Sequence, residues 1–196
     1  MSVMHRPRSS RLFGSALFGL PALVITLGSL GACAEEVVTV ASPPTSAQYQ
    51  VSFGSTKIAV AAESLQVTVF DATNAQKDGT DCLTLITKER SGADLPGGAL
   101  RLGQTAVVPV CDIVLDASSD PASRKGALPA ISYGKRSYLA VTKRGTADFF
   151  IGCASADLTA NSAPVDIPLS QADVTVQVPD TTCATLGDKC RQTGCK

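Results

Sequence analysis

Residues 136–157 read RSYLAVTKRGTADFFIGCASAD and decide the fold that we expect for this chain. In this stretch we predict a strand at Arg136–Thr142, a tight turn at Lys143–Thr146 and a returning strand at Asp148–Asp157. After a further turn, Val165–Leu169 alternates apolar and polar residues, as a strand does when one of its faces meets a core. Turns at such short, regular intervals indicate an antiparallel meander.

Upstream of the meander, apolar and polar residues continue to alternate with a period of two residues. Leu65, Val67 and Val69 alternate with polar neighbours, which is typical of a half-buried strand. Thr56–Glu63 is the best helical candidate, but no stretch combines a period of 3.6 residues with capping residues, so we expect a strand there too. Pro109 restricts its strand to an edge or a bulge, because proline has no N–H to donate. Further strands are predicted at Leu65–Asp71, Cys82–Thr87, Thr105–Cys111 and Val174–Val178, with a turn-rich loop at Asn74–Asp81.

Short strands of this kind predict an all-β protein, an antiparallel β-sandwich of about seven strands. The late meander resembles the C-terminal half of the immunoglobulin-like or transthyretin-like sandwiches found on exported bacterial proteins. That resemblance implies a fold and no functional residues, and the absence of tryptophan disfavours an antibody-type domain. The predicted division is a signal peptide at 1–32, a flexible tether at 33–48, a β-sandwich at 49–179 and a cysteine-rich tail at 180–196. The end of the tether stays open, because Val37, Val38 and Val40 could pair as a short edge strand.

The N-terminus has the pattern of a secretory signal peptide. Arg6, Arg8 and Arg11 precede an uncharged segment, Leu12–Ala34, that ends in small residues. Its last part, Leu30-Gly31-Ala32-Cys33, resembles the lipobox of bacterial lipoproteins. The resemblance implies cleavage before Cys33, a diacylglyceryl thioether on its sulfur and, since Ala34 follows, sorting to the outer membrane, on either face. A retained membrane-spanning helix and soluble secretion are the alternatives.

The cysteine count agrees with a lipid on one thiol. Of seven cysteines, assigning Cys33 to the lipid leaves six, and an oxidising compartment favours three disulfides. Six cysteines allow fifteen pairings. We rank a bond from Cys82 to Cys153 first, because it would join two distant parts of one core, and we expect one bridge within the tail and a bond from Cys111 to the remaining tail thiol. The six are Cys82, Cys111, Cys153, Cys183, Cys190 and Cys195.

The residue counts exclude several kinds of chemistry. The single histidine, His5, lies in the leader, so the mature chain has no imidazole for Ser-His-Asp or Cys-His catalysis or for histidine-ligated metals. We expect no cofactor and no metal. The leader also removes three arginines, which leaves 14 Lys+Arg against 17 Asp+Glu, a net charge of −3. These charges are scattered, so nucleic acid is a poor candidate partner.

One motif suggests an enzyme. Ser132-Tyr133-Gly134-Lys135 matches the S-x-x-K spacing of penicillin-interacting enzymes, in which the serine and lysine share one helical turn. Gly134 lies inside the motif, strand sequence follows it, and no K-T-G or S-D-N partner is present. We favour a chance match.

Three side-chain clusters have a structural and a functional interpretation. The oxygens of Asp71, Asn74, Asp78 and Asp81 could hold Ca²⁺, and Asp112, Asp116 and Asp120 invite the same hypothesis, but turn geometry alone explains these residue types. Tyr133, Tyr138, Phe149 and Phe150 could stack on a glycan or peptide. We favour core filling, because one of two adjacent strand residues, Phe149 or Phe150, must point inward.

The function that we expect from the sequence is that of a non-enzymatic, lipid-anchored cell-envelope protein with a binding or structural role. Its membrane contact is the lipid anchor, and its partner is an envelope protein or a polysaccharide. The alternatives are an envelope enzyme that uses Ser132 and Lys135 or carboxylates alone, and a calcium-dependent adhesion module.

Overall fold

The computed structural model describes residues 38–41, 48–116, 124–173 and 175–191. All of them belong to Ala34–Lys196, one of the two compact units into which the chain divides. The predicted signal peptide, Cys33, Asp120 and Cys195 lie outside the described residues. Among the helices of the described part, none is both long and apolar enough to cross a membrane.

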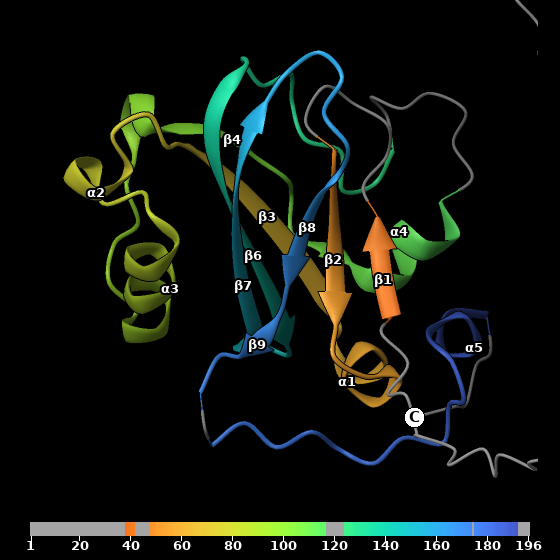
Figure 1. Ribbon diagram of the computed structural model, residues 1–196. Coiled ribbons are helices and arrows are strands. Elements are labelled where there is room, and N and C mark those ends of the chain that lie inside the picture. Colours follow the sequence, from red (N-terminus) through yellow and green to blue (C-terminus); the bar gives the residue numbers. More distant parts are fainter. Residues whose placement is uncertain (1–37, 42–47, 117–123, 174, 192–196) are drawn as a thin grey trace, which may run out of the picture. The chain divides into compact units, whose positions relative to one another are not determined.

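The smaller sheet brings together segments that are far apart in the sequence (Figure 1). Its strands are β1 (Val38–Ala41), β2 (Tyr49–Phe53) and β8 (Val165–Pro168), in the order β1-β2-β8. β1 runs antiparallel to β2, whereas β8 runs parallel to it. The expectation of a purely antiparallel fold is therefore wrong here. Parallel neighbours are joined by long connections, and local turn signals do not report them.

The first strand lies inside the segment 33–48 that the sequence predicts as a flexible tether. Val40 of β1 pairs with Val51 of β2 and is buried. The described body thus includes Val38, and only residues 34–37 separate that residue from Cys33. The tether to a lipid on Cys33 would be much shorter than the sequence suggests.

The larger sheet is antiparallel and is built on the predicted hairpin. β6 (Gly134–Arg144) and β7 (Ala147–Leu158) flank a turn in which Gly145 has a φ of 59°, a conformation that glycine adopts without strain. The strand order is β4-β3-β6-β7-β9, and β5 pairs with β3. The other strands of this sheet are β3 (Ser64–Asp71), β4 (Arg101–Gln104), β5 (Val108–Pro109) and β9 (Ser170–Gln171).

The two sheets share one hydrophobic core. Each fully buried aliphatic or phenyl side chain contributes about 1.5–3 kcal/mol relative to an exposed one, so this contact holds the two layers together. The core contains Tyr49, Val51, Phe53, Val165 and Ile167 of the smaller sheet and Leu65, Val67, Val69, Tyr138, Phe149 and Phe150 of the larger one.

A helix covers the other face of the larger sheet. α3 (Cys82–Ser91) places Leu85 in a second core cluster with Phe70, Leu139 and Ile151. Phe70 is fully buried in this cluster, on the side of β3 that the alternation assigns to solvent. β3 is consequently covered on both faces, rather than half-buried as predicted.

The strand predicted at Cys82–Thr87 is wrong, because α3 occupies these residues. The side chain of Asp81 accepts a hydrogen bond of 3.0 Å from the backbone N–H of Thr84 and so caps the first turn. Gly92 follows the last turn in the left-handed conformation, with a φ of 67°. These two end signals and the apolar contact of Leu85 outweigh the strand preference of the residues between them.

Three other predicted strands are also corrected. Thr56–Ala61 is a helix, α1, with Ser55 as its N-cap. In Thr105–Cys111, only β5 is extended, at an edge as Pro109 requires, and a helix begins at Val110. Thr175–Val178 is not a strand. The body is mostly β, with two sheets and few helices, rather than all-β. The remaining helices are α2 (Ala75–Asp78), η1 (Gly98–Leu100), α4 (Val110–Leu115) and α5 (Leu186–Arg191).

A β-bulge beside the hairpin turn explains the two adjacent phenylalanines. Thr142 pairs with Phe150, whereas Lys143 pairs with Asp148, so Phe149 is an extra residue in β7. Phe149 and Phe150 are both buried in the common core, and their rings meet edge to face at 4.8 Å. The prediction of core filling is confirmed, but both rings point inward, because the extra residue interrupts the alternation of the strand.

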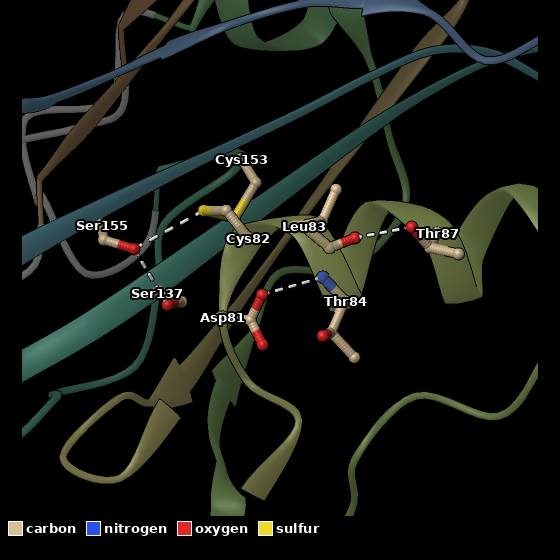
Figure 2. The surroundings of a disulfide bond; sticks show 8 residues. All are labelled: Asp81, Cys82, Leu83, Thr84, Thr87, Ser137, Cys153 and Ser155. Carbon is tan, nitrogen blue, oxygen red and sulfur yellow. Dashed lines mark hydrogen bonds between the residues drawn. A yellow bond between two sulfur atoms is a disulfide. The ribbon is translucent and has the colours of Figure 1, made fainter. Parts of the chain in front are cut away.

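Two disulfides tie helices to distant parts of the body. The predicted bond between Cys82 and Cys153 joins the start of α3 to β7, and the hydroxyl of Ser155 lies 3.5 Å from the sulfur of Cys82 (Figure 2). Cys111 is bonded to Cys190, a tail cysteine as predicted, which links α4 to α5. Cys183 is disulfide-bonded too, and its partner lies outside the described residues, so the bridge within the tail stays a prediction.

The chain crosses from one sheet to the other at Leu169. The N–H of Leu169 donates to the carbonyl of Ser52 in β2, whereas the next residue, Ser170, already pairs with Ile151 of β7. Gly152 lies under this crossing, and a Cβ placed on it would be 2.3 Å from the carbonyl oxygen of Pro168. Glycine is therefore required at position 152, where the chain passes from the smaller sheet to the larger one.

Candidate binding site at the hairpin turn

A pocket of about 290 Å³ lies where the end of α1, the β6–β7 turn and α5 meet. The C-terminal segment, which runs below α1 towards α5 in Figure 1, supplies its remaining wall. The pocket therefore combines parts of the chain that are remote in sequence. Its lining residues are Val60, Ala61, Glu63, Arg144, Pro179, Asp180, Thr181 and Lys189.

Glu63 holds the hairpin turn against α1. Its N–H donates to the carbonyl of Lys143 at 3.0 Å, and its Oε2 accepts a hydrogen bond of 2.7 Å from the N–H of Gly145. The guanidinium of Arg144 lies beside the same carboxylate, with Nε 3.8 Å from Oε1. Both carboxylate oxygens are thus engaged, and the turn that carries Arg144 is fixed.

Lys189 is the second cation of the pocket. Its Nζ donates a hydrogen bond of 2.6 Å to the carbonyl of Ala62, which directly follows α1. Burial lowers the pKa of Lys189, the charge of Glu63 opposes this shift, and the charge of Arg144 adds to it. Lys189 is therefore attracted by Glu63 and, more weakly, repelled by Arg144.

A second hollow, of about 470 Å³, shares Glu63 and Arg144 with the first. It is lined on one side by the start of β7 and on the other by Val176 and Gln177 of the C-terminal segment. Among the described residues that line it, the acidic ones are Glu63 and Asp148, and Asp148 forms an ion pair with Lys143. Arg144 is thus accessible from two adjoining hollows.

No protein-family model, curated protein or solved structure matches this chain. The function proposed below therefore depends on the sequence and on the geometry of this molecule alone.

The S-x-x-K residues do not form the arrangement that catalysis needs. Ser132 precedes β6 and Lys135 lies on it, so the two are not on one helical turn. The hydroxyl of Ser132 instead accepts a hydrogen bond of 3.0 Å from the guanidinium of Arg136.

Arg136 organises this region, and sequence reasoning missed it. It is 5% exposed and donates to the carbonyls of Ser132, Tyr133 and Lys135. Its Nη1 also lies 3.4 Å from the carboxylate of Asp71. No sequence signal distinguishes this arginine from the exposed ones, since the partners are mostly backbone carbonyls.

Three of the acidic residues considered for calcium serve local structure. Asp71 accepts from the N–H of Thr73, Asp81 caps α3, and Asp116 accepts from the N–H of Lys125. Within the described ranges, no group of three or more His, Cys, Asp or Glu residues could hold a metal ion. Of the four aromatic residues, Tyr138, Phe149 and Phe150 are buried, and Tyr133 is 59% exposed.

Glu89 on α3 is a partly buried acidic group whose surroundings disfavour its charged form. Burial raises its pKa, and repulsion from Asp148 adds to this shift, while Lys143 and Arg101 oppose it. Because the folded state binds the proton of Glu89 more tightly than the unfolded chain does, ionisation of Glu89 costs stability as the pH rises above its ordinary pKa.

Glu89→Gln is therefore expected to stabilise the protein at about pH 7, by roughly 0.5 kcal/mol, and to lose this advantage near pH 4 and below. Urea unfolding at several pH values measures the difference. Asp157→Asn, at an exposed position on β7, is the control. A gain from Glu89→Gln that does not change with pH would contradict the assignment.

Proposed function

We propose that this chain is a non-enzymatic, lipid-anchored protein of the bacterial cell envelope, and that its β-sandwich body binds a partner there. The observation that carries the proposal is the state of the cysteines: Cys82, Cys111, Cys153, Cys183 and Cys190 are all disulfide-bonded. Disulfides persist in exported proteins and are rare in the cytosol. This supports export, which the leader sequence also indicates.

The anchor that we propose is a diacylglyceryl group on Cys33. The lipobox Leu30-Gly31-Ala32-Cys33 supports it, and so does the engagement of five other cysteines in disulfides. Ala34 after the cysteine supports sorting to the outer membrane. The mature body then carries a small negative charge and binds an envelope protein, a polysaccharide or the membrane surface itself, rather than nucleic acid.

Cys33→Ala is the direct test. The wild-type protein is expected to incorporate radiolabelled palmitate in cells and to begin at Cys33, whereas the variant is expected to take up no label and to keep its leader. Intact-mass analysis and gel autoradiography measure both. The control is the double variant Cys82→Ala/Cys153→Ala, which should remain labelled. A wild-type protein that begins at Met1 and carries no acyl chain would overturn the proposal.

A further inference from the structure

We propose that the pocket between Arg144 and Lys189 binds a phosphate group, and that the anchored body uses it to hold a phospholipid headgroup. The inference deepens the proposed function, and its membrane part depends on the lipid at Cys33.

Several hydrogen-bond donors of the pocket have no acceptor among the described protein groups. Within the described residues, Arg144 makes one ion pair, through Nε, and its terminal Nη atoms make no hydrogen bond. Lys189 uses one of its three N–H bonds, on the carbonyl of Ala62. Both oxygens of Glu63 are already engaged, and exposed Asp180 is paired with Lys57 at 2.7 Å. An oxyanion is the ligand that such a donor set accepts best.

The electrostatics of the pocket favour the same ligand. The charge of Arg144 disfavours the charged form of half-buried Lys189, although the charge of Glu63 favours it. An anion between them would relieve the repulsion and would replace the water that burial has removed from the ammonium group. The pocket is small, and Val60, Ala61 and Pro179 give it apolar walls. These features suit a compact phosphate group with little else attached inside the pocket.

The position of the anchor directs this pocket towards the membrane. Val38 and Thr39 line a hollow with Thr56 of α1 and Leu186 of α5, the two helices that also bound the phosphate pocket. An extended chain from Cys33 reaches no more than about 18 Å from Val38. The end of the body formed by α1, α5 and the hairpin turn would therefore lie within reach of the headgroups.

The reactivity of Lys189 reports on the pocket. Its lowered pKa makes the amine nucleophilic, so a soluble N-hydroxysuccinimide ester should acylate it readily in the free protein. The purified protein is studied in a neutral detergent, with three additions in turn: inorganic phosphate, phosphatidylglycerol or phosphatidylcholine. Peptide mass spectrometry measures the acylation rate of Lys189 against Lys77 on α2, which is remote from the pocket lining.

Phosphate or phosphatidylglycerol is expected to slow acylation of Lys189 about fivefold without affecting Lys77. Arg144→Gln should weaken the apparent affinity about tenfold or more, since it removes a charged hydrogen-bond donor. The matched control is Arg191→Gln, an exposed cation on α5 that does not line the pocket, and it should behave as wild type.

Protection by phosphatidylglycerol at concentrations where inorganic phosphate has no effect identifies the headgroup as the source. Equal protection by inorganic phosphate supports the phosphate site and overturns its assignment to lipid. Protection by neither, or protection that Arg144→Gln leaves intact, overturns the site itself. The intact mass of the same sample shows independently whether Cys33 carries a lipid. Absence of the lipid anchor and absence of phosphate binding in the pocket are therefore distinguished.

Discussion

Gly152→Ala is expected to lower the free energy of unfolding by about 3 kcal/mol, at the upper end of what an added methyl group costs in a filled interior. The new Cβ would stand 2.3 Å from the carbonyl oxygen of Pro168 and 3.0 Å from a methyl carbon of Leu169. The first of these atoms belongs to the backbone and cannot turn aside. The chain would have to lift off β7 where it leaves β8 for β9.

Gly54→Ala is the matched control, because a Cβ on Gly54 meets nothing within 4 Å. It is expected to be neutral or to stabilise by up to about 1 kcal/mol, through the lower entropy of the unfolded chain. Guanidinium unfolding of both variants measures the difference. Equal midpoints for Gly152→Ala and Gly54→Ala would show that the crossing tolerates a side chain.

The double variant Cys82→Ala/Cys153→Ala is expected to lose about 2–4 kcal/mol of stability. The bond closes a loop between residues 71 apart in sequence, so its removal releases much conformational entropy in the unfolded chain. It also frees the first turn of α3, which covers the outer face of the larger sheet through Leu85. Denaturant unfolding under non-reducing conditions measures the loss.

Cys111→Ala/Cys190→Ala is the informative comparison, because this bond spans a similar separation of 79 residues. Both double variants should lose stability, but only the second removes a restraint from α5, which carries Lys189. The reactivity of Lys189 should therefore change in the second variant and stay constant in the first. A loss below about 1 kcal/mol in the first variant would mean that α3 is held by its apolar contacts alone.

The hairpin could be predicted from sequence because its information is local. The turn at Lys143–Thr146 and the flanking strands depend on neighbours in the chain, and β6 and β7 confirm them. α3 carried local signals as well, in Asp81 and Gly92, but the β-branched residues between them suggested a strand. The parallel pairing of β2 with β8 and the burial of Phe70 under α3 arise from contacts between remote segments, which no local pattern encodes.

The candidate site was harder to predict than the fold. The turn at Lys143–Thr146 could be predicted, yet nothing near it in sequence indicates that Glu63 or Lys189 lies beside it. These side chains meet because the hairpin turn is hydrogen-bonded to Glu63 after α1, and Lys189 of α5 is hydrogen-bonded to Ala62. The disulfide at Cys190 holds α5 in place. The S-x-x-K motif shows the opposite error, in which a local spacing suggests a site that the surrounding strand does not form.

The parallel pairing of β2 with β8 also constrains the order in which the strands can pair during folding. A chain that emerges N-terminus first presents Tyr49–Phe53 long before Val165–Pro168 is available to complete the sheet. The inner edge of β2 stays open for that interval, and the loop closed by the pairing is long, so this step is slow. The smaller sheet is therefore completed only after nearly all of the chain is available for pairing.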